Sequence, residues 1–594
     1  MECARHVVRM DEAAGCARCH TSASGACGRK GMKLPRSMIT PEAMALVATN
    51  TSAPSRTSTT PVAGGRHERI DVPEHLQASV VVAMSNDVGD ADINVMIYID
   101  HRVKSSAAVG TWLKRMDELK IGYAIESVTV DALERMRRQH GSARRDDPMQ
   151  ATQSRALSLL SLAAAAGASD VHILVRHRHT DVQVRINGDL FTSDEFSMHA
   201  DEGRRLIGAI YQGLATNKPP ELKPQEFQDA QIDGETLAGT GLSTVRIIRG
   251  PSVPIAHGGG ILVARLQRRP DTVPTRSRRD AIRALRLRAP TRPEQSENDS
   301  AWKGFAPEQV ERMRRIAHRP NGLVGLTGPT GSGKTQAIFH MERYIAQRFP
   351  ERRQISIEDP PEFEKEWGVQ LVVGVHSYMD LLRETLRMDP NMLMVGELRA
   401  PEEAQTALEA ALTGRLVLTT LHVIDPYYCF ERLEDMDPVR LSRRNTCNPE
   451  KVIAVIGMRL LPRLCEHCRV PLVDAAHDAV PDEVMRALQT WGDTRSVHVR
   501  GPGCEHCDGL GTAGRVVAAE IIETDVALMA DLRALPLDEV KGRHRARPEA
   551  DYSMLAYAVA NVLAGRVDPN AAQSQLSMDV RNGERLPSVE ELAP

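Results

Sequence analysis

The sequence predicts an α/β protein of several domains, the last of which is an open sheet with a phosphate-binding loop. The glycine-rich run at residues 328–335, GPTGSGKT, follows an apolar stretch at 323–326 that predicts a short buried strand. It precedes residues 337–341, which predict the start of a helix. Strand, glycine loop and helix in this order are the context that a P-loop requires. A chain of 594 residues is also too long for one hydrophobic core.

The glycine loop indicates nucleotide binding for a direct physical reason. Glycines let the backbone curl so that several N–H groups point inward, and the helix N-terminus adds partial positive charge. Lys334 is expected to reach the β- and γ-phosphates of ATP, and the Thr335 hydroxyl is expected to bind Mg²⁺. The predicted nucleotide-binding residues are Gly328, Pro329, Thr330, Gly331, Ser332, Gly333, Lys334 and Thr335.

Three later strands end in side chains suited to phosphate chemistry. They are the strands at 354–357, 391–395 and 416–421, and the side chains that follow them are Glu358, Glu397 and His422. The carboxyl ends of parallel strands face the ligand side of an open α/β sheet. An acid at the Walker B position of Glu397 can position or deprotonate the attacking water, and His422 can sense the γ-phosphate. We therefore expect Glu397, Glu358 and His422 to be catalytic residues.

The composition restricts the class of protein and its location. The net charge is −3, which does not indicate a general nucleic-acid coat. No apolar run is long enough to span a bilayer and no signal-peptide core follows the N-terminus, so a cytoplasmic location is expected. The ten cysteines are clustered, which in a cytosolic chain favours metal binding over disulfides.

Residues 1–75 are predicted to be a disordered N-terminal segment, because Ser, Thr, Gly and Pro dominate and hydrophobic periodicity is absent. This segment contains Cys16, Cys19 and His20 in the form CxxCH. That form allows a covalent haem site, a weak zinc knuckle or no function, and without an export signal the last interpretation is favoured.

Four further regions follow along the chain. Residues 76–145 predict a small α/β module, and 150–269 a domain that opens with an Ala/Leu-rich helix followed by strands. Residues 270–303 are basic and contain proline, which favours a solvated linker over a nucleic-acid patch at neutral total charge. Residues 304–594 hold the nucleotide-binding domain and its C-terminal helices.

Together with the P-loop, four other sequence boxes stand in the order of a known family. They are ASDVHI at 168–173, SIEDP at 356–360, DPN with GELR at 389–399, and TG with TTLH at 413–422. Over about residues 150–570 the chain thus resembles the hexameric ATPases of type II secretion and type IV pilus assembly. The resemblance implies a RecA-like P-loop NTPase core with an upstream α+β, PAS-like N-terminal domain.

The resemblance also implies an activity, partners and further site residues. It implies a homohexameric ring that hydrolyses ATP and water to ADP and phosphate, peripheral on the inner face of the plasma membrane. The implied partner is an inner-membrane platform protein, with no direct contact to nucleic acid. Arg246, Arg249 and Arg265 match by position the arginine fingers that the family's N-terminal domain closes on the phosphates. Judged alone, each would be taken for a side chain on a solvated strand face.

Two CxxC knuckles predict a structural zinc site. Its ligands are Cys465, Cys468, Cys504 and Cys507, and four thiolates suit tetrahedral Zn²⁺ without an open position. The segments that flank the knuckles resemble the family's tetracysteine insert, here residues 463–515. That insert is typical of assembly and export ATPases and absent from the pilus-retraction type, so it favours pilus extension or export.

The sequence also departs from the family pattern. Ala400 stands where the family often has aspartate, Arg415 replaces the usual histidine, and Val423 replaces threonine. Asn187 and Gly188 stand where the family usually has Asp-Gly. Two other functions therefore remain as alternatives. One is a nucleic-acid-translocating P-loop motor of a conjugative system, prompted by the basic linker. The other is a scaffold with an inactive ATPase site, prompted by Ala400 and Arg415.

Overall fold

A computed structural model of the chain describes residues 58–60, 70–73, 76, 79–84, 95–118, 122–129, 132–133, 148–269, 276–294, 302–374 and 376–593. It divides into two compact units, Met1–Arg144 and Arg145–Pro594, which are described separately. The CxxCH run and most of segment 1–75 lie outside the described residues. Within that segment β1 (Ser58–Thr60) pairs antiparallel with β2 (Ile70–Val72), which differs from the predicted disorder.

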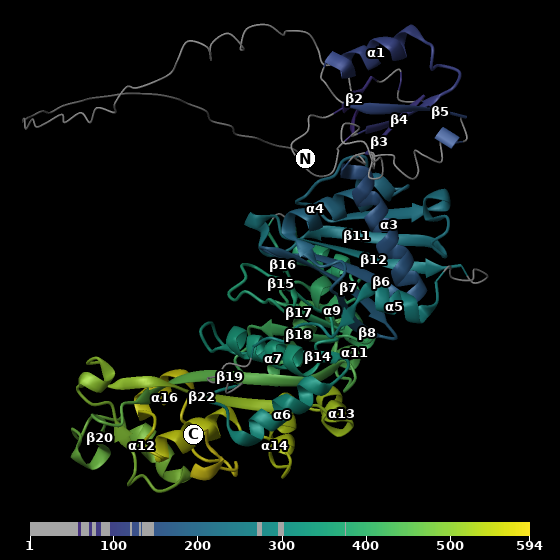
Figure 1. The fold of residues 1–594 in the computed structure, drawn as a ribbon. Helices are drawn as coiled ribbons and strands as arrows, with labels where there is room; N and C mark the ends of the chain where they lie inside the picture. The colour runs from purple at the N-terminus through teal and green to yellow at the C-terminus, as the bar shows by residue number, and fades with distance from the viewer. Residues whose placement is uncertain are drawn as a thin grey trace, which may run out of the picture. The chain divides into compact units, whose positions relative to one another are not determined.

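The first unit contains a three-stranded sheet covered by one helix (Figure 1). Its elements are β3 (Val80–Met84), β4 (Val95–Asp100), α1 (Ala107–Glu118) and β5 (Tyr123–Val128). Strand β4 is central, antiparallel to β3 and parallel to β5. Val109, Trp112 and Met116 recur at helical spacing, and this face of α1 packs on Ile97 and Ile99. The unit is therefore a small α/β module.

The second unit opens with an α+β domain built on an eight-stranded sheet. The strands are β6 (Ala168–Val175), β7 (His179–Ile186), β8 (Asp189–Ser193), β9 (Met198–His199), β10 (Gln228–Asp233), β11 (Leu242–Pro251), β12 (Gly260–Arg268) and β13 (Leu287–Arg288). Helices α3 (Pro148–Ala166) and α4 (Ala200–Gly208) contact the sheet, and the core includes Leu159, Ile173 and Val184. The strand pairs are antiparallel.

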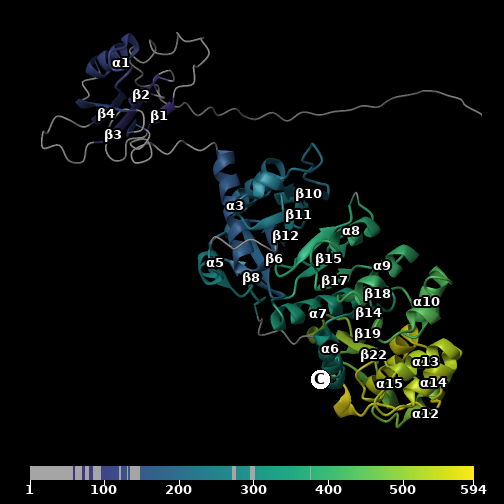
Figure 2. The same ribbon diagram turned by 90° about the vertical axis from the view of Figure 1, so that its right-hand side faces the viewer.

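The structure corrects the prediction of a linker over residues 270–303. Residues 278–285 form helix α5 (Arg278–Leu285), which lies against α3 (Figure 2). Its Ala281 and Leu285 are buried in the core of the α+β domain, and β13 adds to the edge of the sheet. Several of the basic side chains bind within this domain, since Arg278 donates to the Ala166 carbonyl and Arg288 to Asp194. The sequence of this segment predicted a linker because the two buried residues of α5, Ala281 and Leu285, stand among a larger number of arginines.

The nucleotide-binding domain is a doubly wound α/β layer structure. Its sheet has the order β16-β15-β17-β18-β14-β19-β22, and all neighbours are parallel except β19 and β22. The strands are β14 (Gly322–Thr327), β15 (Gln354–Glu358), β16 (Val369–Val372), β17 (Met392–Val395), β18 (Leu416–Leu421), β19 (Val452–Leu464) and β22 (Thr512–Glu523). Alternate residues of β17 point into two different cores, Leu393 into one and Met394 into the other.

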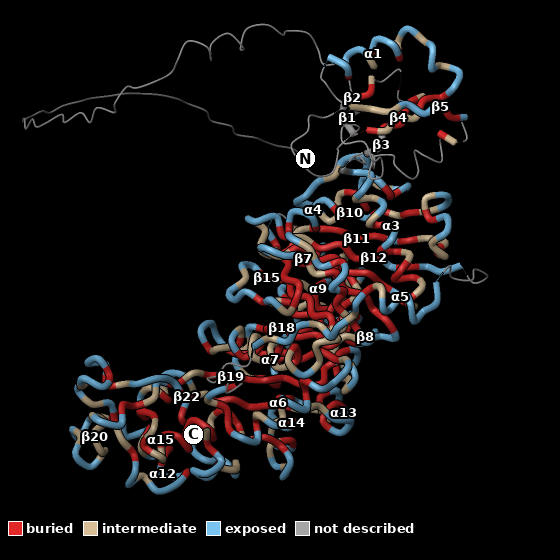
Figure 3. The backbone as a smooth tube through the Cα atoms, viewed as in Figure 1, coloured by how far each residue is buried: buried red, intermediate tan, exposed pale blue. Residues whose placement is uncertain are grey.

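Helices cover both faces of this sheet. The buried residues of this part of the chain are red in Figure 3. Helices α8 (Tyr378–Thr385), α9 (Pro401–Leu412) and α10 (Tyr428–Met436) contribute to one core, and α6 (Pro307–His318) and α7 (Lys334–Arg348) to the other. Strands buried on both sides explain the continuous apolar runs of the sequence. The predicted RecA-like P-loop core with an upstream α+β domain is confirmed.

Strands β19 and β22 are long and carry an insert between them. It contains β20 (Val470–Pro471), α12 (Asp482–Trp491) and β21 (His498–Val499). Helix α11 (Arg443–Thr446) precedes β19. After β22 the chain forms α13 (Val526–Ala534), α14 (Leu537–Arg545), α15 (Met554–Leu563) and α16 (Pro569–Gln575). Leu488 of α12 and Val559 of α15 share one core, so the insert is packed onto the C-terminal helices. Among the described residues, no helix combines the length and apolarity that crossing a bilayer would require.

Candidate functional site

The predicted P-loop lies between β14 and the first residue of α7. Gly328, Gly331 and Gly333 have φ of 141°, 80° and 88°, backbone conformations that favour glycine. Gly333 caps α7 without a side-chain hydrogen bond, so the first N–H groups of the helix point freely at the loop. The Lys334 ammonium donates to the carbonyl oxygens of Gly328 and Pro329 at 2.8 and 2.9 Å. The loop therefore presents amide donors and one ammonium group at the same place.

One cavity of about 500 Å³ brings the predicted catalytic groups together with this loop. Its lining includes residues 330–335 of the P-loop, Glu358, Glu397 and His422. The Glu397 carboxylate binds Arg399, and its Oε2 lies 3.3 Å from His422 Nε2. Lys334 and Glu397 thus share one side of the sheet, as their places at the ends of β14 and β17 require.

Glu358 forms part of the cavity wall but is held from behind. Its Oε1 accepts hydrogen bonds from Ser356 Oγ at 2.6 Å, Lys365 Nζ at 2.9 Å and Gln370 Nε2 at 3.1 Å. Neither Lys365 nor Gln370 was predicted as part of the site. No sequence pattern around Lys365 or Gln370 indicates the contact, because Lys365 lies in the loop after β15 and Gln370 lies in β16, the strand that follows this loop.

The three predicted arginine fingers do not line this cavity within the chain. Arg249 is buried and donates to the Lys223 carbonyl at 2.7 Å and to Gln228 Oε1 at 3.0 Å, so it braces its own domain. Arg265 donates to Asp170 at 2.9 Å. Arg246 is exposed and lines a separate hollow. Arg246 and Arg265 are both exposed, and Arg265 is in addition paired with Asp170, whereas Arg249 is buried.

A charged contact joins the α+β domain to the nucleotide-binding domain at Asp389. Its Oδ2 lies 3.1 Å from Nε2 of the fully buried His172 and accepts a short hydrogen bond from Arg185. Arg185 also donates to Asn391 Oδ1 at 2.9 Å. Burial raises the pKa of the Asp389 carboxyl, but the hydrogen bond from His172 and the charge of Arg185 outweigh this effect and lower it to about 2. Two of the sequence boxes therefore meet in space, which their spacing in the chain did not reveal.

The four predicted zinc ligands converge into a cluster, hereafter the tetracysteine cluster. The ligand atoms of Cys465, Cys468, Cys504 and Cys507 all lie within 4.8 Å of one another. Sγ–Sγ distances are 3.7 Å between Cys465 and Cys504, and 3.8 Å from Cys507 to both Cys468 and Cys504. A tetrahedral ion with bonds of about 2.3 Å places its sulfurs about 3.8 Å apart, so these residues fit Zn²⁺. They are too far apart for disulfides.

Comparison with known proteins identifies the family. The model for "Type II/IV secretion system protein" matches residues 261–570, just over half of the chain. The chain belongs to this family. The match confirms the predicted family. It extends from β12 to α16 and therefore includes the segments between the sequence motifs as well as the motifs themselves.

Curated relatives of this chain carry two kinds of name. The type IV pilus assembly ATPase PilB of Thermus thermophilus is 31% identical over 402 residues, and the type II secretion system protein HxcR of Pseudomonas aeruginosa is 30% identical over 376 residues. These alignments cover 65% and 62% of this chain, and 40% and 65% of the relatives. The chain thus spans less than two thirds of the length of these relatives. A solved structure of the pilus retraction motor PilT with ADP aligns at 22% identity and a TM-score of 0.34, over 70% of this chain and 96% of that chain.

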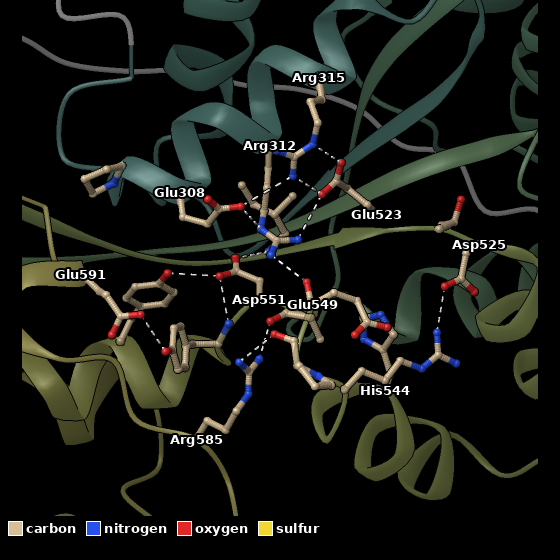
Figure 4. A pocket seen from close by; sticks show the side chains of 18 of the residues that line it. Glu308, Arg312, Arg315, Glu523, Asp525, His544, Glu549, Asp551, Arg585 and Glu591 are labelled. Carbon is tan, nitrogen blue, oxygen red and sulfur yellow. Dashed lines mark hydrogen bonds and ion pairs between the residues drawn. The ribbon is translucent and has the colours of Figure 1, made fainter.

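Another hollow, of about 870 Å³, has none of the P-loop residues in its lining. Figure 4 shows the side chains that surround it. It is bordered by α6, the end of β22 and the C-terminal segments. Arg312 and Arg315 both bind Glu523 there, at 3.0 and 2.9 Å, and Arg585 donates to backbone carbonyls. Its charges thus bind one another across the cavity, and size alone does not identify the site.

Two further residues of the cavity beside the P-loop were not predicted. Leu460 of β19 and Arg515 of β22 line it opposite the acidic strand ends. Both also line an adjoining hollow of about 260 Å³ beside Pro329 and Ser332. Their approach depends on the sheet order, which places β19 next to β14, and no local pattern signals it.

Proposed function

We propose that this protein is an ATPase that converts ATP and water to ADP and phosphate. The observation that supports this most directly is the single cavity of about 500 Å³ lined by Lys334, Glu358, Glu397 and His422. Loop amides, one ammonium group and acids of neighbouring strands would there meet the same triphosphate. The alternative of an inactive site rested on Ala400 and Arg415, and neither lines the cavity.

Each side chain has a role that follows from its place. Lys334 would offset the negative charge of the β- and γ-phosphates, and the loop amides would orient them. Glu397, at the Walker B position, would position the attacking water and accept its proton. His422 lies within 3.3 Å of Glu397 Oε2 and would report the state of the γ-phosphate to that acid.

Two metal ions belong to this proposal. Thr335, which lines the cavity, would contribute its hydroxyl to Mg²⁺, and that ion would offset phosphate charge. The tetracysteine cluster would hold a structural Zn²⁺, because four thiolates leave no open position for chemistry. Zinc there would tie the end of β19 to the start of β22, the strands that carry Leu460 and Arg515.

We further propose that the protein works as a homohexameric ring on the cytoplasmic face of the inner membrane. The names of its relatives support type IV pilus assembly or type II secretion as the process. The partner that we propose is a membrane platform protein. The tetracysteine cluster, typical of the assembly and export type, supports extension over retraction. Arg246 and Arg265 would act on the nucleotide of a neighbouring subunit.

The alternative of a nucleic-acid motor is less well supported than the secretion or pilus motor. It rested on the basic run at 270–303, and Arg278 and Arg288 of that run bind within their own domain. Stimulation of turnover by DNA with a steep dependence on salt would restore it.

Phosphate release by the purified full chain tests the proposal. Lys334→Ala and Glu397→Gln should each lower the rate by about 100-fold or more, because each removes a group that acts on the reacting phosphate. Glu235→Gln, an exposed acid on the α+β domain, is the matched control and should keep the wild-type rate. Turnover that survives both substitutions would contradict an ATPase at this site.

A further inference from the structure

A buried cluster of three charges lies directly behind the nucleotide cavity. Lys365 Nζ lies 2.6 Å from Glu342 Oε2 and 2.9 Å from Glu358 Oε1. The three residues are 4%, 1% and 4% exposed. Glu342 belongs to α7, the helix that starts with the P-loop lysine, whereas Glu358 ends β15. Lys365 thus connects the P-loop helix to a predicted catalytic acid.

The loop that carries Lys365 is fixed on its own account. The Lys365 backbone N–H donates to Gln370 Oε1 at 2.7 Å, and Gln370 Nε2 donates to the Phe363 carbonyl at 2.8 Å. Gln370 Nε2 also donates to Glu358 Oε1 at 3.1 Å. One glutamine of β16 therefore holds the lysine backbone and the carboxylate at the same time, which leaves the lysine side chain little freedom.

The contacts on Glu358 are all on one oxygen. Ser356, Lys365 and Gln370 each donate to Oε1. Three donors on one carboxylate oxygen restrict the direction of the group, and Glu358 is one of the residues that line the cavity. An ion cluster that only stabilised the fold would not require all three donors on the same oxygen of a carboxylate that lines a cavity.

The charges in the cluster also support a defined role for the lysine. Burial lowers the pKa of Lys365, but Glu342 and Glu358 outweigh burial and raise it, so the ammonium stays charged. Burial raises the pKa of Glu342 to about 7. Lys365 thus remains the charged partner of Glu358.

We propose that Lys365 is a positioning residue for ATP hydrolysis: it holds the Glu358 carboxylate toward the nucleotide and fixes that acid relative to the P-loop helix through Glu342. The inference rests on the proposed ATPase function. It assigns to Lys365 an effect on the chemical step that passes through Glu358, and little effect on nucleotide binding.

A double-mutant cycle on phosphate release tests this role in the full chain. Lys365→Met should lower kcat by about 10-fold or more while KM changes by less than about 3-fold, because binding uses the loop and not Glu358. Glu358→Gln should be equally slow, and the double variant should be no slower than Glu358→Gln alone. Losses that multiply in the double variant would overturn the inference, because Lys365 would then act independently of Glu358.

Two further variants separate positioning from folding. Glu342→Gln with Lys365→Met removes a buried carboxylate together with its cation, so it should fold even where Lys365→Met alone does not, and it should keep the loss of kcat. Lys541→Met breaks an ion pair of 3.0 Å with Asp425 outside the cavity and should leave kcat unchanged. Wild-type kcat in the folded Glu342/Lys365 variant would overturn the inference and leave the ATPase intact. Wild-type protein without turnover would overturn the proposed function, and the inference with it.

Discussion

Asp389→Asn is expected to weaken the junction between the α+β domain and the nucleotide-binding domain. The substitution keeps the size of the side chain but removes the charge that faces Arg185, whose side chain is only 6% exposed. Removing one partner of a buried ion pair leaves an uncompensated charge, which typically costs about 3–5 kcal/mol. Arg185 keeps its bonds to Gly188 and Asn391, so we expect a cost of about 3 kcal/mol in this protein.

The pKa of Asp389 gives a second, independent magnitude. A carboxyl whose pKa falls from 3.8 to about 2 on folding stabilises the folded state by about 2 kcal/mol above both values. Because the pKa in the folded state is the lower one, this stabilisation is complete above about pH 4 and is lost as the pH falls from about 4 to 2. Burial lowers the pKa of His172 to about 4, so this histidine is neutral at pH 7 and contributes a hydrogen bond.

Urea unfolding at several pH values, with hydrogen exchange in β6 and β7, measures the effect. The Asp389→Asn variant should be less stable by about 2–3 kcal/mol at pH 7, and its difference from wild type should shrink below pH 4. The matched control is Asp229→Asn, which breaks an exposed ion pair with Arg387 that joins the same two domains, and should cost at most about 1 kcal/mol. Equal effects of the two substitutions, or a difference that persists at pH 2, would refute this account of the junction.

Three other predictions concern a zinc-cluster cysteine, a nearby glycine and a buried arginine. Cys465→Ser should reduce bound zinc, measured by mass spectrometry of the metal, and lower the melting temperature; unchanged metal content would exclude the tetracysteine cluster as the site. Gly501→Ala should have the same effect, because a Cβ would lie 1.6 Å from the Cys468 carbonyl oxygen, whereas Gly542→Ala in helix α14 has open space and should be neutral or stabilising. Arg249→Ala should lower stability by about 2 kcal/mol, since it removes a donor from the buried Gln228 Oε1 and from the Lys223 carbonyl, and equal stability to wild type in a urea titration would show that its bonds contribute nothing.

Local patterns carried much of the prediction in the nucleotide-binding domain. The P-loop residues and the strand ends at Glu358, Glu397 and His422 could be read from apolar runs and glycines, because a parallel sheet brings its carboxyl ends to one side. The segment 278–288 could not be read in this way. Only Ala281 and Leu285 of α5 are buried there, and an excess of arginines hides so narrow an apolar face.

The sequence by itself determined which residue types and motifs occur, and therefore the fold class, the family and the candidate catalytic groups. Only the tertiary structure decided which groups meet: His172 with Asp389, Lys365 with Glu342 and Glu358, and Arg249 with carbonyls of its own domain. The physical reason is that motifs are set by bonding within a few residues, whereas burial, ion pairing and pKa shifts depend on side chains brought together from distant parts of the chain.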